Sequence, residues 1–433
     1  LREYAERSSG QSLSRRMFAD DAAKGFAFID LCRKRYDVVL MNPPFGTINS
    51  SCISYISINY RITASNLAST FYERAVSLSS KGKIGAIVDI AIMIRSSYTD
   101  FRRDILYGQS MLTSLCLLGW DVLDDANVET CFFTSDTAPR VLNHYTSCLD
   151  IRNLPGKNDI LQDHVLRMNF ICSYQDSFLS FPNRVPAFYL PASFRKIFKQ
   201  SSPIDPTVFK VCTGLSSGDN LRFYKLLWEI PQKNIGVTWK HLSNGGDYAP
   251  FYRQWCDLIN WKSNGALIES NQGAFIRNES KYFKHGLTYG KRGKYLSVQF
   301  HNSERIITNE GQGVFCLDNE ELICYCAILN STSFQVLINT YCGQHKENGY
   351  VKLLPTLEIG TLNREKLISL SIQAQKVVRF LLSSILEHAE FITLHWLSLI
   401  DENNTKLFNI FSKYLEKIRP KLDVLDKVEK SIN

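Results

Sequence analysis

Residues Tyr36–Gly46 read YDVVLMNPPFG, a short apolar run that follows an aspartate and ends in a loop with two prolines. Such a run is typical of a buried strand in a parallel sheet. Prolines restrict φ and cannot donate to a sheet ladder, so Pro43 and Pro44 must end the strand. In open α/β sheets, ligands bind at the loops that follow the carboxyl ends of the strands. The sequence therefore predicts a binding site at Asn42–Phe45.

The groups in this loop suit a planar amine. The side-chain carbonyl of Asn42 and the main-chain carbonyl of Pro43 can each accept a hydrogen bond. Phe45 offers a flat apolar ring on which a planar group can stack. The alternative is a strand that ends in a proline-rich turn with Asn as a turn residue. The further matches described below favour the binding site.

The motif Asn42-Pro43-Pro44-Phe45, placed after an apolar strand, resembles the catalytic motif of amino-group DNA methyltransferases of the adenine-N6 type. In that family the target adenine is flipped out of the duplex. The Asn side chain and the first Pro carbonyl accept hydrogen bonds from its exocyclic amine, which attacks the methyl group of S-adenosylmethionine. The resemblance implies that these four residues are catalytic and that Phe45 stacks on the base. It also implies S-adenosylmethionine as cofactor and double-stranded DNA as partner.

The segments after the loop alternate between helix and strand. Ile84–Asp89 and Leu112–Leu118 are typical of buried strands, and Tyr98, Phe101 and Ile105 fall on a helix between them. The earlier helix is predicted by the one-face spacing of Leu67, Phe71, Ala75 and Leu78. Strands that alternate with helices predict a parallel sheet with right-handed crossovers.

This order resembles the second half of a class-I, Rossmann-like methyltransferase fold. The resemblance implies that Val128–Phe133 forms the terminal hairpin of the sheet. The family often places a second aromatic residue against the flipped base at this hairpin. Phe133 or Phe132 is the candidate for that role, and the alternative is an ordinary core residue.

The same family binds S-adenosylmethionine on a glycine-rich loop that precedes the catalytic motif. The 41 residues before Asn42 contain no such loop, and the chain begins with Leu1 rather than methionine. We therefore expect the cofactor-binding residues to lie mostly upstream of Leu1, in a longer chain or in a partner. We expect no metal site, because a sulfonium is already an activated methyl donor.

A basic block follows in the middle of the chain. Between Arg184 and Phe300 there are seventeen Lys and Arg against seven Asp and Glu, a net charge of +10, whereas the whole chain carries +8. Such a block indicates a surface that binds a polyanion. The alternative is a basic face that only contacts water.

Two segments of this block carry a second resemblance. Val211–Phe223, VCTGLSSGDNLRF, and Phe251–Trp261, FYRQWCDLINW, resemble segments of large adenine methyltransferases of the BREX phage-resistance type and of fused restriction–modification enzymes. The chain departs from that pattern at Ser217, where Thr is usual, and at Cys256, where Tyr is usual. The resemblance covers roughly residues 36–355.

The basic block also interleaves cationic and aromatic side chains. Lys and Arg can neutralise phosphates, Arg and Asn can read base edges, and a Gly-Asp-Asn turn can bring main-chain N–H groups close to phosphate oxygens. We expect Trp228, Trp255 and Trp261 to be core residues of a β-rich domain. The candidate DNA-binding residues are Asp219, Asn220, Arg222, Arg253, Arg277, Lys291 and Arg292.

The last part of the chain has helical periodicity. Two sets of apolar residues keep the spacing of one helix face, with a turn at Asp401–Asn404 between them; they are Val378, Leu381, Leu382 and Ile385, and Leu407, Ile410, Phe411 and Tyr414. We predict α/β architecture in three parts. Residues 1–150 are the C-terminal half of a methyltransferase catalytic domain with a partial Rossmann-like sheet, residues 151–360 are a mixed α+β target-recognition domain, and residues 361–433 are a helical segment.

Length and composition set further limits. A chain of 433 residues has room for two or three domains. The longest apolar run, Ile84–Ile94, is interrupted by Asp89 and is too short to cross a bilayer, so we expect no membrane partner. The twelve cysteines show no metal-binding spacing, and we expect reduced, mostly buried thiols in a cytoplasmic protein.

Together these patterns predict a site-specific DNA adenine N6-methyltransferase of a restriction–modification or phage-defence system, with other defence-system subunits as further partners. Two alternatives stay open. The missing glycine loop favours a non-catalytic DNA-binding specificity fragment. Asn-Pro-Pro loops also serve methyltransferases that act on RNA or on protein glutamine, but those usually carry Tyr at the fourth position, where this chain has Phe45.

Overall fold

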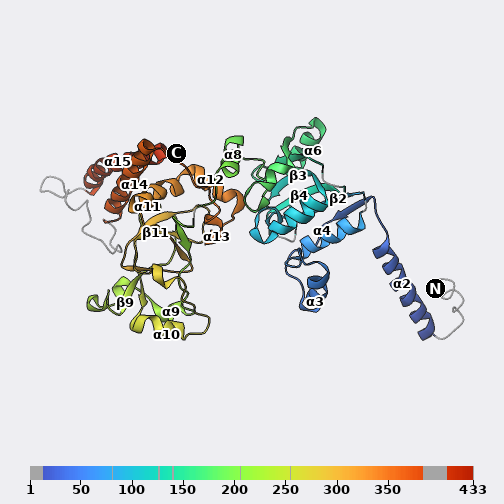
Figure 1. The fold of residues 1–433 in the computed structure, drawn as a ribbon, viewed down its shortest axis with the longest axis horizontal. Coiled ribbons are helices and arrows are strands. Elements are labelled where there is room, and N and C mark those ends of the chain that lie inside the picture. The colour runs from blue at the N-terminus through green and yellow to red at the C-terminus, as the bar shows by residue number, and fades with distance from the viewer. Residues whose placement is uncertain are drawn as a thin grey trace. The chain divides into compact units, whose positions relative to one another are not determined.

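The computed structural model describes residues 13–79, 81–124, 127–138, 141–204, 206–253, 255–383 and 407–432. The chain divides into two compact units, Leu1–Arg195 and Lys196–Asn433, which we call unit 1 and unit 2 (Figure 1). The sheet of unit 1 extends past residue 150, where the sequence analysis ends the catalytic part. The three domain boundaries given there stay predictions.

Unit 1 is built on one six-stranded sheet with the order β1-β2-β4-β3-β5-β6. Its strands are β1 (Val38–Met41), β2 (Lys83–Asp89), β3 (Met111–Gly119), β4 (Thr130–Asp136), β5 (Tyr145–Asp150) and β6 (Ile171–Tyr174). β1 is parallel to β2 and β3 is parallel to β5, whereas β4 is antiparallel to both of its neighbours and β6 to β5. The first three strands therefore run in one direction, as the alternation of strands and helices predicts.

The position predicted for the terminal hairpin was wrong. β3 and β4 do pair as antiparallel neighbours. However, β4 lies between β2 and β3, and the sheet continues through β5 and β6. The inserted strand makes the sheet mixed rather than parallel, because β4 runs against both neighbours.

The helices of unit 1 connect these strands. They are α2 (Leu13–Arg33), α3 (Ser50–Asn59), α4 (Leu67–Leu78), α5 (Ala91–Ile94), the 3₁₀-helix η1 (Ser96–Tyr98), the π-helix η2 (Phe101–Gln109), α6 (Lys157–Arg167), α7 (Gln175–Leu179) and the 3₁₀-helix η3 (Pro182–Arg184), while α8 (Ala192–Gln200) carries the boundary between the units. The helix predicted from the spacing of Leu67, Phe71, Ala75 and Leu78 is confirmed as α4, and Ala75 is buried in the core, but the placement of Phe71 on the inner face was wrong. Phe71 is 47% exposed, and Tyr72 lies on the buried side instead.

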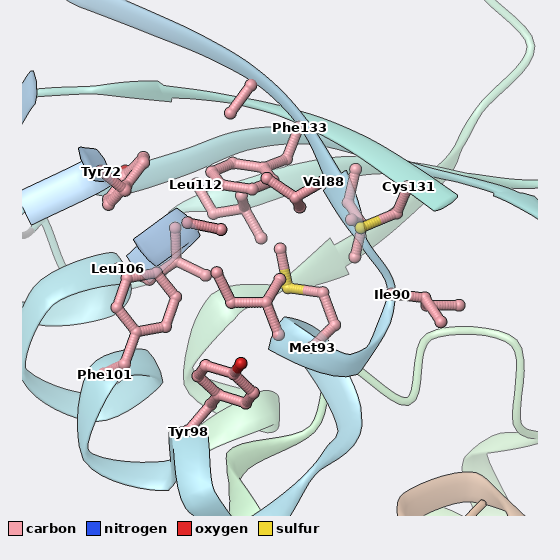
Figure 2. Packing of buried hydrophobic residues seen from close by; sticks show 14 of the residues in the cluster. Tyr72, Val88, Ile90, Met93, Tyr98, Phe101, Leu106, Leu112, Cys131 and Phe133 are labelled. Atoms are coloured by element: carbon pink, nitrogen blue, oxygen red, sulfur yellow. The ribbon is translucent and has the colours of Figure 1, made fainter. Parts of the chain in front are cut away.

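The main core of unit 1 lies on one face of the sheet (Figure 2). Alternate residues of β2, namely Ile84, Ala86 and Val88, point into it, as the two-residue period of a strand requires. Tyr72 of α4 and Phe101 of η2 belong to the same core. Their ring centroids lie 5.6 Å apart in an edge-to-face arrangement. A smaller cluster around Cys116 and Leu118 occupies the opposite face, where Ile160 and Leu161 of α6 pack against it. Helices therefore cover both faces of the sheet.

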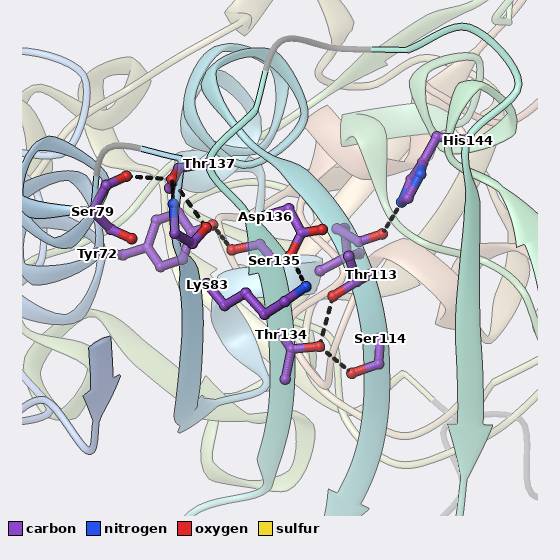
Figure 3. A network of polar contacts seen from close by, with 12 residues as sticks. Tyr72, Ser79, Lys83, Thr113, Ser114, Thr134, Ser135, Asp136, Thr137 and His144 are labelled. Carbon is purple, nitrogen blue, oxygen red and sulfur yellow. Dashed lines mark hydrogen bonds and ion pairs between the residues drawn. The ribbon is translucent and has the colours of Figure 1, made fainter. Parts of the chain in front are cut away.

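A buried polar network links α4 to the sheet (Figure 3). The Tyr72 hydroxyl lies 2.6 Å from the Ser135 hydroxyl of β4 and 2.8 Å from the Ser110 hydroxyl. Burial raises the pKa of Tyr72 to about 12, so the phenol stays protonated at neutral pH. These bonds satisfy polar atoms that would otherwise be buried without partners.

Unit 2 contains two four-stranded sheets, with the orders β13-β9-β10-β8 and β12-β11-β14-β7. The strands are β7 (Lys210–Cys212), β8 (Tyr224–Leu226), β9 (Trp239–Ser243), β10 (Asp257–Asn260), β11 (Gly286–Gly290), β12 (Val298–His301), β13 (Arg305–Ile307) and β14 (Gly311–Phe315). Trp255 and Trp261 are buried, which confirms them as core residues. The same prediction was wrong for Trp228, whose side chain is 60% exposed.

Short helices interrupt the strands of unit 2 and longer ones follow them. They are α9 (Asn220–Phe223), η4 (Leu227–Glu229), η5 (Gln232–Asn234), η6 (Lys262–Gly265), α10 (Ala266–Glu269), η7 (Glu279–Lys281), α11 (Asn319–Asn330), α12 (Thr332–Tyr341), α13 (Asn348–Val351), α14 (Thr361–Leu382) and α15 (Leu407–Ile432). The helical C-terminal part is confirmed for α14 and α15, which pack together. Ile385 and the turn predicted at Asp401–Asn404 lie outside the described residues.

Two further observations concern membranes and thiols. In the described ranges, no single helix has the length and hydrophobicity to cross a membrane; α11 and α12 meet that test only as a pair bent by 71°. All twelve cysteines lie in described residues and are free thiols. Seven of them are buried, which confirms the expected predominance of buried thiols.

The network around Tyr72 generates a prediction. Tyr72→Phe should lower the free energy of opening of β4 by about 1–3 kcal/mol, because the Ser135 hydroxyl loses its partner inside the core. Hydrogen exchange of the β4 main-chain amides measures this quantity. The exposed Tyr55 provides the matched control, and Tyr55→Phe should change it by less than about 0.5 kcal/mol. Equal protection in both variants would show that the hydroxyl contributes nothing to stability.

Candidate active site

Main-chain hydrogen bonds hold both ends of the Asn42–Phe45 loop. Before β1, the Asp37 carbonyl accepts from the Lys83 N–H at 2.7 Å. After the loop, the Gly46 carbonyl accepts from the Leu67 N–H at 3.3 Å, which ties the loop to the start of α4. Gly46 has a φ of +123°, in the region that favours glycine, so the chain can turn here without steric strain.

The side chains of the loop differ in exposure. Pro43 is buried, and Phe45 is half-buried against the main core of unit 1. Asn42 and Pro44 are exposed. The Asn42 side chain makes no hydrogen bond to another described residue, and the Pro43 carbonyl accepts none from the described part of the chain. The two acceptors that the sequence analysis assigns to an amine are therefore free, while Phe45 anchors the loop.

A hollow of about 440 Å³ lies beside Asn42 on the sheet face opposite the main core. The pairing of β1 with β2 and of β2 with β4 sets Leu40, Gly85 and Thr134 in one row across its floor. Leu40 is 79% exposed although it belongs to a paired strand. Gly85 has no side chain, and the Leu40 side chain lies over it, because a Cβ at Gly85 would come within 2.7 Å of the Leu40 Cδ2 atom. The hollow is thus an open, largely apolar surface that reaches the candidate catalytic residue.

The two aromatic candidates of β4 lie on opposite faces of the sheet. Phe133 is fully buried in the main core, with its ring 5.3 Å from that of Tyr72 (Figure 2). Phe132 is half-buried and lines the hollow together with Asn42. The base-stacking role given to Phe133 stays a prediction, and the structure places Phe132 nearer to the surface that a ligand can reach.

Sequence reasoning missed two residues at the same edge of the sheet. Asp89 ends β2, and its carboxylate accepts from the Ala91 N–H at 2.8 Å. Trp120 follows β3 and is 47% exposed. Because β1, β2 and β3 run in the same direction, the loops after them share one edge. A polar or exposed aromatic residue directly after a buried strand was the signal available in the sequence.

A larger cavity of about 1150 Å³ opens at Trp120. It shares Ile87 and Phe132 with the hollow beside Asn42, so the two are contiguous. Arg152 and Lys157 line its outer part. The edge that carries Asn42 therefore continues into a wide surface of mixed charge, because Asp121 and Asp159 also line the cavity and Arg152 pairs with Asp150 at 2.7 Å.

In unit 2, the Gly-Asp-Asn turn builds local structure. The Asp219 carboxylate accepts from the Arg222 N–H at 3.2 Å and caps α9. The Asn220 side chain accepts from the Ser217 hydroxyl at 2.7 Å. These hydrogen bonds engage side-chain oxygens of Asp219 and Asn220, which are both candidate DNA-binding residues. The DNA-binding roles of Asp219 and Asn220 stay predictions.

The five cationic candidates have three kinds of surroundings. Arg222 and Arg277 are exposed, and each guanidinium lies over a neighbouring phenylalanine ring, at 4.9 Å and 4.4 Å. The described residues form no ion pair with either of these two. Lys291 and Arg292 pair with Glu347 and Glu310. Arg253 is half-buried and donates to the Gly245 carbonyl. Arg222 and Arg277 are therefore the two candidates best placed to meet a polyanion.

Comparison with known proteins shows what the segment that carries Asn42 is similar to. Residues 3–115 match the Eco57I restriction-modification methylase family. This methylase segment contains β1, the Asn42–Phe45 loop and β2. The chain is also 21% identical over 330 residues to the adenine-specific methyltransferase PglX of Lacticaseibacillus casei (strain Zhang). That match covers 69% of this chain and 27% of the relative.

Two solved structures share the fold. The type IIL restriction-modification enzyme MmeI, in complex with DNA, matches with a TM-score of 0.54 and 11% identity over 91% of this chain and 53% of its own. A nuclease-deletion mutant of the type ISP restriction-modification enzyme LlaGI, in complex with a DNA substrate mimic, matches with a TM-score of 0.50 and 11% identity over 81% of this chain and 42% of its own. The chain thus spans about half of the length of MmeI and less than half of the length of LlaGI and of PglX.

The described residues before Asn42 do not fit the cofactor that the motif implies. They form α2 and β1, and their one glycine, Gly25, lies inside α2. A glycine loop that follows a strand, as dinucleotide-like ligands require, is not present in residues 13–41. The described residues that precede Asn42 therefore do not fit S-adenosylmethionine.

The division among the cationic candidates generates a prediction. Arg253→Ala should lower the unfolding free energy of unit 2 by about 1–3 kcal/mol, because it removes a partly buried hydrogen bond to the Gly245 carbonyl and the cation beside Asp257, whose pKa is raised by burial and only partly brought back by the Arg253 charge. Arg222→Ala should change the unfolding free energy of unit 2 by less than about 0.5 kcal/mol, because Arg222 is exposed. Hydrogen exchange of the β10 amides reports both effects. Equal effects of the two variants would contradict the division into a structural and a free arginine.

Proposed function

We propose that this chain carries the base-binding and target-recognition part of an adenine-specific DNA N6-methyltransferase from a restriction–modification or phage-defence system. The observation that carries the proposal is the pair of free acceptors at Asn42 and Pro43, at the end of a strand and beside an open hollow. The match of residues 3–115 to a restriction-modification methylase family supports it.

The chain's own residues act on the amine of the substrate. An exocyclic amine has two N–H bonds, and the Asn42 side-chain carbonyl and the Pro43 main-chain carbonyl accept one each. This pairing directs the nitrogen lone pair outward, and the two oxygens stabilise the positive charge that the nitrogen gains as it forms its bond to carbon. S-adenosylmethionine supplies an activated methyl group when it is bound. As the nitrogen–carbon bond forms, the carbon–sulfur bond breaks and its electron pair stays on sulfur. The amine then loses one proton to water, which restores a neutral N-methyl adenine.

The adenine must leave the duplex to reach this loop, because its amine is paired and stacked inside DNA. Phe45 belongs to the loop and packs against the main core, and the half-buried Phe132 lines the hollow on the other face of the sheet. The exposed Trp120 at the adjoining cavity suits a base of the DNA that flanks the flipped adenine, since exposed aromatic side chains stack on bases. We assign duplex DNA as substrate on these grounds.

The decisive experiment is transfer of labelled methyl from S-adenosylmethionine to adenine in duplex DNA, with this chain and with the full-length protein that contains it. Label from the full-length protein supports the proposed reaction. If label appears on RNA or on protein glutamine instead, that molecule rather than DNA is the substrate. Salt-sensitive DNA binding without any label would make the chain a binding module.

The proposed chemistry predicts the phenotype of Asn42→Ala in the full-length protein. Methyl transfer should fall by about a hundred- to a thousandfold, because one of the two acceptors is lost, while the affinity for duplex DNA stays within about threefold. The exposed Asn59, at the end of α3, provides a control whose change to Ala should leave both quantities unchanged. If Asn42→Ala lowers DNA affinity as much as it lowers the rate of methyl transfer, Asn42 is not a catalytic residue.

The charge division predicts the salt dependence of DNA binding. Arg222→Ala and Arg277→Ala should each reduce the slope of log K against log salt by about one, because each loses one phosphate contact. Lys430 already pairs with Asp426 at 2.6 Å, so Lys430→Ala should leave the slope unchanged. Fluorescence anisotropy over a salt series measures the slope. Parent-like slopes for both arginine variants would exclude them from the DNA contact.

A further inference from the structure

Two segments of unit 2 that are far apart in the sequence form one surface. Residues 216–222 lead into α9, and residues 271–278 follow α10 (Figure 1). The main chains of Ser216 and Phe275 exchange two hydrogen bonds, at 2.9 and 3.0 Å. Every residue of both segments is described, and we call the two segments the paired loops.

Contacts between the paired loops fix the position of residue 272. Gly218 has a φ of +70°, and a Cβ there would lie 2.6 Å from the main-chain oxygen of Gln272. The two main chains therefore touch at a point where only glycine fits. On the residue before Gln272, the Asn271 side chain donates to the Ser217 carbonyl at 2.8 Å. Gln272 thus leaves from a main chain that is held from two sides.

The paired loops carry four side-chain amides, and three of them already have hydrogen-bond partners in the protein. The Asn220 side-chain carbonyl accepts from a serine hydroxyl at 2.7 Å. The amides of Asn271 and Asn278 donate to main-chain carbonyls at 2.8 and 2.9 Å. The Gln272 side chain is exposed and makes no hydrogen bond with the described part of the chain. Its donor and its acceptor are therefore both available to a ligand.

The surface next to Gln272 is open. Gly273 has a φ of +78°, and a Cβ placed on it would meet no atom of the described structure within 4 Å. A glycine at an open loop tip lets a ligand approach the main chain closely. A flat, rigid partner such as a base edge can therefore reach the Gln272 amide without a clash.

Cations lie on both of the paired loops, although the charge of the surface is mixed. Arg222 and Arg277 are exposed, and the described residues form no ion pair with either of them. The acidic residues of the same region are Asp219, which caps α9, and the exposed Glu269 and Glu279. Charge alone therefore does not explain what this surface binds, and hydrogen bonding by the amide must contribute.

We propose that Gln272 is a specificity-determining residue that reads one adenine of the recognition sequence in the major groove of duplex DNA. The amide oxygen accepts from the adenine N6 amino group while the amide nitrogen donates to N7, and among the four bases adenine offers this pair of groups. Arg222 and Arg277 contact phosphates and set the register of the paired loops on the duplex. The adenine that Gln272 reads stays stacked, whereas the adenine that is methylated leaves the duplex.

This inference rests on the proposed function in one respect, namely that duplex DNA is the substrate. It does not depend on methyl transfer, because the paired loops lie outside residues 3–115, which match the methylase family. The test is therefore made on DNA binding, so that it can succeed or fail separately from the methylation experiment.

The experiment is selection of bound duplexes from a pool of random sequence by the full-length protein that contains this chain, followed by sequencing. We expect the parent protein to enrich a sequence with adenine at a defined position. Gln272→Ala should lower the preference for adenine at that one position about ten- to a hundredfold and keep the preferences at the others. Gln232→Ala changes an exposed glutamine of η5, outside the paired loops, and should alter no preference.

Three results of this selection would overturn the inference. They are a parent protein that enriches no sequence, a Gln272→Ala variant that keeps every preference, and a Gln272→Ala variant that loses all preferences together. The last result would mean that Gln272 supports binding in general and does not read a base.

A second variant tests the inference by a gain rather than a loss. Arg donates two hydrogen bonds to O6 and N7 of guanine, so Gln272→Arg should change the preferred base at the same position from adenine to guanine. A misfolded protein cannot produce such a change. If Gln272→Arg still selects adenine at that position, the residue does not contact the base.

The two experiments together separate this inference from the proposed function. A preference that depends on Gln272 in a protein without methyl transfer supports the inference and contradicts the proposed reaction. Methyl transfer to adenine in duplex DNA by a protein whose preferences do not depend on Gln272 supports the reaction and overturns the inference.

Discussion

The parallel pairing of β1 with β2 is the constraint on which the candidate site depends. β1 has only four residues, and its described pairing partner is β2 alone. The register sets Met41 opposite Ala86, so the chain leaves the sheet at Asn42 beside Ile87. Because side chains alternate between the two faces of a sheet, a shift by one residue would move Met41 out of the core and turn Leu40 into it. The direction in which Asn42 leaves the sheet follows from that register.

The Asn42–Phe45 loop is anchored by some of its residues, while its two hydrogen-bond acceptors are left without partners among the described residues. Phe45 packs on the main core, Pro43 is buried, and Gly46 is tied to α4 through its carbonyl. The two acceptors make no hydrogen bond within the described part of the chain, so binding an amine breaks none there. Such pre-organisation favours binding, because the entropy of ordering the loop is lost on folding rather than on binding.

In unit 2 the basic residues that look equivalent in the sequence have different surroundings. Arg253 contributes to folding, Lys291 and Arg292 are paired with carboxylates, and Arg222 and Arg277 are exposed. A net charge of +10 in a segment therefore overstates the number of free cations. Only exposed, unpaired cations release counterions when they meet a polyanion, since paired ones have already lost much of their field.

The sequence by itself determined the strand that ends at Asn42, the alternation of helices and strands in unit 1, and the helical C-terminal part, because these depend on local spacing and on proline geometry. It failed on the exposed Phe71, on the exposed Trp228 and on the position of β4. Each of these depends on which partner covers a surface, and hydrophobicity alone does not specify the partner. Only the tertiary structure set Phe132 beside Asn42 and brought Gln272 against Gly218, because residues far apart in sequence meet only when strand pairing and helix packing bring them together.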